Sequence, residues 1–104
     1  MLSMNYEELG PGDELDRLVL DSVMGGDAPG GREQFSTVGP ANKAMIERLG
    51  EQGFEYRLQN KGHRPPWVAW FGRDGKAWEA TSRTQFAANC MAALKAADYL
   101  DSLG

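Results

Sequence analysis

The spacing of hydrophobic residues predicts two helices in the first half of the chain. From residue 13, apolar side chains recur at intervals of three and four up to a Gly25-Gly26 stop, and three acidic residues stand in the first turn. Acidic side chains at a helix N-terminus interact favourably with the helix dipole. A second stripe of the same period follows Phe35, with Ser36 or Thr37 expected as the N-cap and Pro40 in the first turn.

The period changes to two after residue 53, which predicts β-strands. Phe54, Tyr56 and Leu58 alternate with polar residues, and two further strand-like runs follow at 67–71 and 76–81. Asp74-Gly75 separates these two runs, and both residues tolerate the positive φ of a two-residue hairpin turn. The resulting register pairs Phe71 with Trp78 and Ala69 with Ala80, and places Trp70 opposite Glu79.

A last helical segment is predicted from Ser82, where Gln85 three positions later makes a capping box. Its stripe is rich in alanine, which permits close approach to the sheet. The sequence therefore predicts an α+β fold, a small α/β/α sandwich with the order α-α-β-β-β-α and a three-stranded sheet built on the Asp74-Gly75 hairpin. Helices are expected over both faces of the sheet because both faces carry apolar residues.

The chain of 104 residues is the size of one domain, spanning residues 1–104. Within it we predict an N-terminal arm over 1–11 and a flexible glycine-rich loop over 25–34. Hydrophobic residues make up 41% of the chain and charged residues 25%, which argues against disorder. The absence of a long apolar run and of a basic N-terminal segment predicts a soluble, cytoplasmic protein without a membrane partner.

Candidate catalytic and metal-binding residues are few. Cys90 and His63 are the single cysteine and histidine, so an internal disulfide and a Cys/His zinc site are excluded. Cys90 lies on the apolar stripe of the last helix, where burial is expected to make it inert. The neighbouring acidic residues of the first helix are interpreted as a solvated face. We therefore predict no catalytic residues, no metal site and no cofactor.

The formal net charge of −4 argues against a general phosphate-backbone binder. This charge is unevenly distributed. Residues 1–30 carry seven acidic residues and one arginine, whereas residues 61–83 carry five basic and two acidic residues. The simplest interpretation is a domain whose opposite faces carry opposite charges, and the alternative is two faces with different partners.

Five short segments of the chain form a pattern through their order and spacing. They are Glu14-Leu15-Asp16-Arg17-Leu18-Val19, Val23-Met24-Gly25, Phe35-Ser36-Thr37, Glu79-Ala80-Thr81 and Cys90-Met91-Ala92-Ala93-Leu94-Lys95-Ala96. Together these segments resemble a small family of bacteriophage proteins, the phage ABA sandwich domain family. The resemblance implies an α/β/α sandwich of phage or prophage origin, and it implies no established activity and no catalytic residues.

The leading functional hypothesis is a non-enzymatic phage accessory protein that binds a host or phage protein in the host bacterial cytoplasm. Such a protein is expected to modify a host process, for example antiviral defence. The acidic face of the first helix is the candidate protein-binding site, and its residues are Asp13, Asp16, Arg17 and Asp21. The broad apolar surface of the same helix also leaves homodimerisation open.

The alternative hypothesis is a binder of nucleotides or single-stranded nucleic acid. Aromatic residues interleaved with bases on a sheet can stack nucleobases and neutralise phosphates. Trp67, Phe71 and Trp78 share one face and are expected in the core, whereas Trp70 is the tryptophan expected to be partly exposed. The candidate nucleotide-binding residues are Arg64, Trp70, Arg73 and Lys76.

Overall fold

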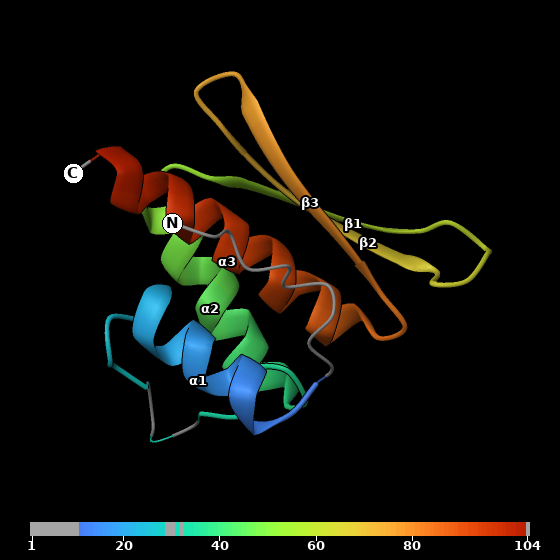
Figure 1. The fold of residues 1–104 in the computed structure, drawn as a ribbon, viewed down its shortest axis with the longest axis horizontal. Coiled ribbons are helices and arrows are strands. Elements are labelled where there is room, and N and C mark those ends of the chain that lie inside the picture. Colours follow the sequence, from blue (N-terminus) through green and yellow to red (C-terminus); the bar gives the residue numbers. More distant parts are fainter. Residues whose placement is uncertain (1–10, 29–30, 32, 104) are drawn as a thin grey trace.

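Three helices and a three-stranded antiparallel sheet make up the part of the chain described by a computed structural model, which covers residues 11–28, 31 and 33–103 (Figure 1). The predicted α+β class and the order α-α-β-β-β-α are confirmed. Apart from residue 11, the predicted N-terminal arm lies outside the described residues. The elements are α1 (Asp13–Ser22), α2 (Gly39–Glu51), β1 (Glu55–Asn60), β2 (Trp67–Arg73), β3 (Lys76–Ser82) and α3 (Gln85–Leu103).

The sheet is built on the hairpin turn that the sequence predicts. Asp74 and Gly75 have φ values of 57° and 76°, the left-handed conformation that a two-residue hairpin needs. β3 therefore returns alongside β2, while β1 pairs with the other side of β2. The predicted pairs Phe71–Trp78, Ala69–Ala80 and Trp70–Glu79 are confirmed.

Helix α3 lies at the centre of the molecule. It packs against β2 and β3 on one side and against α1 and α2 on the other (Figure 1). The sequence predicted a single apolar stripe, but every side chain from Ala87 to Ala97 except Lys95 is buried. Six alanines in this segment let the neighbouring elements approach closely on all sides, because the alanine side chain ends at Cβ.

The layers are therefore the sheet, then α3, then α1 and α2, with all three helices on one side of the sheet (Figure 1). This differs from the expectation of helices on both faces. The fully buried large side chains, such as Phe71, Leu15, Met45 and Leu94, lie on the helix side. Among the described residues no helix covers the outer face, because α1, α2 and the inner face of the sheet all pack against the single central helix.

The predicted stop of α1 is confirmed, and the predicted cap of α2 is wrong. Gly25 and Gly26 have φ values of 63° and 84°, which end the helix. The N-cap of α2 is Val38, which has no side-chain cap bond, because the Ser36 hydroxyl donates to Asp16 instead. In the glycine-rich loop at 25–34 the described residues form no α-helix or strand, and residues 29, 30 and 32 lie outside the description.

The predicted capping box of α3 is also wrong. Ser82 is the last residue of β3, and α3 begins at Gln85. Thr84 takes the capping role, since its Oγ1 accepts the Ala87 N–H at 3.2 Å. The strand thus runs one residue further than expected, and the next hydroxyl along the chain caps the helix.

Candidate functional site

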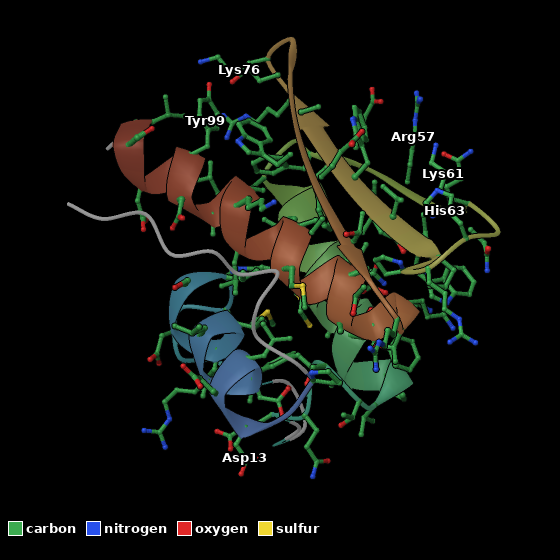
Figure 2. All side chains as sticks on the ribbon, turned by 45° about the vertical axis from the view of Figure 1, so that its right-hand side comes forward. Asp13, Arg57, Lys61, His63, Lys76 and Tyr99 are labelled. Carbon is green, nitrogen blue, oxygen red and sulfur yellow. The ribbon has the colours of Figure 1, made fainter. Side chains whose placement is uncertain are left out.

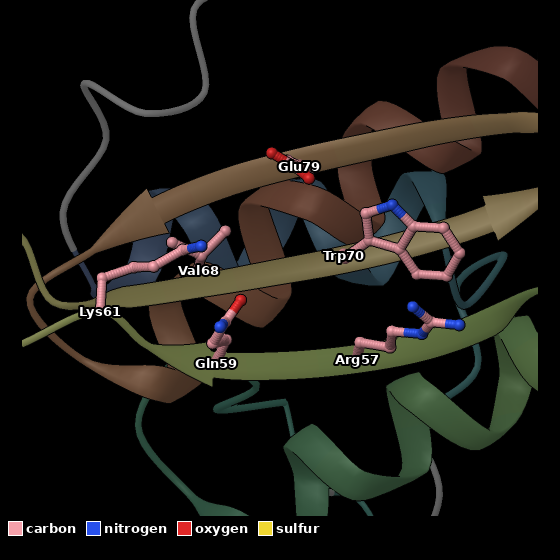
Figure 3. A pocket seen from close by; sticks show the side chains of 6 residues that line it. All are labelled: Arg57, Gln59, Lys61, Val68, Trp70 and Glu79. Atoms are coloured by element: carbon pink, nitrogen blue, oxygen red, sulfur yellow. The ribbon is translucent and has the colours of Figure 1, made fainter.

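The outer face of the sheet is the face that the described helices leave uncovered. Side chains alternate along each strand, so Arg57 of β1, Trp70 of β2 and Glu79 of β3 form one row across this face. Figure 3 shows this row together with the neighbouring side chains. A hollow of about 200 Å³ lies here, and its lining residues are Arg57, Gln59, Lys61, Val68, Trp70 and Glu79.

Trp70 forms a flat platform on this face. Its indole lies over Gly72, two residues further along β2, where a Cβ atom would stand only 2.1 Å from the ring carbon Cη2. The guanidinium carbon of Arg57 lies 4.9 Å from the centre of the indole, a cation–π contact (Figure 3). Unlike Trp67 and Trp78, this half-buried tryptophan does not pack against the hydrophobic core. The glycine and the arginine together hold an aromatic surface toward solvent.

Positive charge gathers at the β1 side of the outer face. In Figure 2, Arg57, Lys61 and His63 lie at one end of the molecule, and Asp13 of α1 lies at the other. Arg64 is also exposed in the β1–β2 loop. The Lys43–Glu47 and Arg73–Asp74 ion pairs lie elsewhere, within α2 and at the β2–β3 turn.

The size of the hollow limits what it can hold. Pockets for whole small-molecule ligands usually measure roughly 300–1,000 Å³. About 200 Å³ is enough for one side chain or one ring. Within the described residues, no group of three or more His, Cys, Asp or Glu could hold a metal ion.

The structure does not bring the predicted nucleotide-binding residues together. Trp70 lies on the outer face, and Arg64 lies in the loop at one end of the sheet. Arg73 lies beside the β2–β3 turn at the other end, where it sits over the Phe54 ring on the helix side. Lys76 follows the same turn, with its ammonium 4.8 Å from the centre of the Tyr99 ring of α3. Of the four residues, only Trp70 lines the hollow.

The cations that do flank Trp70, Arg57 and Lys61, were not among the residues predicted from the sequence. Arg57 occupies a polar position in the alternating pattern of β1, which already placed it on the face away from the core. The missing information was the pairing of β1 with β2. That pairing sets Arg57 opposite Trp70. The loop between β1 and β2 has six residues and contains no two-residue turn motif from which the register of the two strands could be predicted.

Only part of the candidate acidic face of α1 is exposed to solvent. Asp13, Arg17 and Asp21 are exposed, but Asp16 is only 8% exposed. Oδ1 of Asp16 accepts hydrogen bonds from the Ser36 backbone N–H at 2.8 Å and from the Ser36 hydroxyl at 2.6 Å. Asp16 thus joins α1 to the segment before α2, and the surface charge available to a partner comes from its neighbours.

A buried polar network links β1, α3 and α2. The Tyr56 hydroxyl donates to Asn89 Oδ1 at 2.9 Å, and Asn89 Nδ2 donates to Asn42 Oδ1 at 2.9 Å. Asn42 Nδ2 in turn donates to the carbonyls of Phe35 and Phe86 at 2.8 and 3.1 Å. Both asparagines are 2% exposed. These bonds give the buried polar groups of Asn42 and Asn89 their partners and join three elements of the fold.

The two residues of the only candidate thiol–imidazole pair are separated. Cys90 is fully buried on α3, with Asn42 Nδ2 3.6 Å from its sulfur, whereas His63 is exposed in the β1–β2 loop. Burial raises the pKa of the Cys90 thiol well above its ordinary value, and the charge of Asp16 acts in the same direction. Cys90 is therefore held as the neutral thiol.

Cys90 is expected to resist alkylation in the folded protein. The thiolate is the reactive form, and both burial and the raised pKa suppress it. At pH 8 we expect maleimide labelling of native protein to be at least about 100-fold slower than labelling in denaturant, where the thiol has its ordinary pKa. Mass spectrometry of timed samples measures both rates. A native rate close to the denatured one would contradict the burial of this side chain.

None of the protein-family models, curated proteins or solved structures compared with this chain matches it. The resemblance to the phage ABA sandwich domain family therefore stays a prediction. In the part of the chain that the structure describes, no helix combines the length and apolarity needed to cross a membrane.

Proposed function

We propose that the protein is a non-enzymatic binding module whose partner is another protein, and that the partner docks on the outer face of the sheet around Trp70. The observation that carries this proposal is the half-buried Trp70 indole, which lies over Gly72 and against Arg57 on a face that the described helices leave uncovered. Tryptophan and arginine are the residue types most enriched at interface hot spots. A side-chain-sized hollow beside them suits an anchor residue of a partner.

The resemblance to the phage ABA sandwich domain family supports a more specific form of this proposal. In that form the protein is a bacteriophage accessory protein, and its partner is a host or phage protein. Inhibition of a host process such as antiviral defence would follow from occupying that partner. The single cysteine supports the reducing host bacterial cytoplasm as the compartment.

Capture of partners from bacterial lysate with the tagged protein tests this proposal. We expect one protein partner to be captured in stoichiometric amount, in a complex that survives nuclease treatment. Trp70→Ala should reduce the amount of captured partner at least about tenfold. Gly72→Ala is a second test, because the added Cβ displaces the indole while keeping every functional group. Both variants should keep the wild-type melting temperature to within a few degrees.

The double variant Asp13→Lys/Asp21→Lys is the matched control, because it alters the exposed charges of α1 and leaves the sheet untouched. A partner lost with this control but retained by Trp70→Ala would refute docking on the sheet and support the acidic face of α1. A complex that nuclease destroys would refute a protein partner and support the nucleic-acid alternative.

A further inference from the structure

The partner chemistry can be read from the outer face, on the premise that the proposed docking site is correct. Three features have to be matched together. Trp70 offers a flat aromatic surface, and Val68 adds an apolar side chain on the same strand. Arg57 lies beside the Trp70 indole, and the Lys61 side chain lies beside Val68 at the other end of the hollow (Figure 3). Among the described residues, Glu79 is the acidic residue that lines the hollow.

Neither Arg57 nor Lys61 forms an ion pair with another residue in the part of the chain that the structure describes. Lys61 is exposed at the end of β1, and its backbone N–H donates to the Pro66 carbonyl at 2.7 Å, which fixes where its side chain starts. Arg57 contacts the indole of Trp70 with its guanidinium and makes no ion pair within the described part of the chain. A carboxylate placed beside either cation would gain charge-assisted hydrogen bonds.

The same face is poorly matched to nucleic acid. Sheets that bind single-stranded nucleic acid usually stack two or three bases on separate aromatic residues. Among the described residues the outer face has one such aromatic residue, Trp70, because Trp67 and Trp78 pack against the core.

We infer that the outer face binds an acidic segment of a protein that carries an aromatic or large apolar side chain. The ring of that side chain stacks on Trp70 and fills the hollow. Acidic residues beside it in the partner sequence pair with Arg57 and Lys61. This arrangement satisfies the two cations and the aromatic surface with one short extended segment.

Titration with synthetic peptides, followed by NMR chemical shifts, tests the inference directly. The probes are a heptapeptide with a central phenylalanine flanked by glutamates, its counterpart with lysines, and an eight-nucleotide oligothymidylate. We expect the glutamate peptide alone to shift the indole N–H signal of Trp70, with an affinity that falls as salt is raised. Preferential binding of the lysine peptide or the oligonucleotide would overturn the inference.

Charge reversal identifies the residues involved. Lys61→Glu does not alter the contacts of Trp70. The double variant Arg57→Glu/Lys61→Glu should lower the affinity for the glutamate peptide at least about tenfold and raise the affinity for the lysine peptide. Arg83→Glu is the matched control, since Arg83 is an exposed base that does not line the hollow. If Arg83→Glu lowered the affinity for the glutamate peptide equally, the assignment of Arg57 and Lys61 as the binding residues would be overturned. A partner captured through Trp70 but insensitive to both reversals would refute this inference while leaving the proposed function intact.

Discussion

Replacing Asn42 with alanine is expected to lower the free energy of unfolding by about 3 kcal/mol. The change removes the donor to the carbonyls of Phe35 and Phe86 and the acceptor for Asn89, and the bonds to Phe35 and Asn89 are buried. Each buried polar group left without a partner costs about 1–3 kcal/mol. For a domain of this size the melting temperature should fall by roughly 15 °C. Urea unfolding followed by circular dichroism measures the loss.

Tyr56→Phe is the control for the Asn42 prediction. It removes only the hydroxyl at the outer end of the network, which is half-buried, and leaves the Asn42–Asn89 bond in place. We expect a loss of about 1 kcal/mol. If Asn42→Ala cost no more than this control, the network would contribute little to stability, and water would have to satisfy the freed carbonyls.

Removing the Asp16 carboxylate is expected to have the second largest effect. Asp16→Ala leaves the backbone N–H and the hydroxyl of Ser36 without their acceptor, and both bonds are short and charge-assisted. The free energy of unfolding should fall by about 2–3 kcal/mol. Asp16→Asn keeps an oxygen at the same position and should lose about half as much. Urea unfolding at constant salt measures each variant.

Asp13→Ala serves as the comparison within the same helix turn, because Asp13 is exposed and its charge acts on the helix dipole alone among the described interactions. Its effect should stay within about 0.5 kcal/mol. Similar losses for Asp13→Ala and Asp16→Ala would contradict the structural role of Asp16. The contrast also matters for tests of function. A charge reversal at Asp16 would weaken binding by damaging the fold, so substitutions at Asp13 and Asp21 are the ones that test binding by the acidic surface of α1.

The local features of the fold were predictable from the sequence for identifiable reasons. The Asp74-Gly75 turn sets the β2–β3 register by itself, because a two-residue loop allows only one pairing of the flanking residues. Gly25-Gly26 ends α1 through backbone conformations that other residues rarely adopt. The alanines of the last helix indicated close packing. Each of these signals acts over a few residues, so sequence spacing captured it.

The candidate site was predictable only in part. Trp70 was recognised because the hairpin register alone sets it opposite Glu79. Arg73 and Lys76 flank the same turn, yet they contact Phe54 and Tyr99 on the helix side, because alternation gives them the opposite face from Trp70. Arg57 and Lys61 were missed because they reach Trp70 through the β1–β2 pairing, which is long-range.

The sequence by itself determined the number, order and approximate limits of the helices and strands, the hairpin register and the burial of Cys90, since these follow from periodicity and local backbone preference. Tertiary structure alone decided that α3 occupies the centre, that all helices lie on one side of the sheet, and that Asp16 is inside. Those outcomes depend on which apolar surfaces meet, and several arrangements of the same elements satisfy the same pattern. The outer face with Trp70 and Arg57 is a product of that packing.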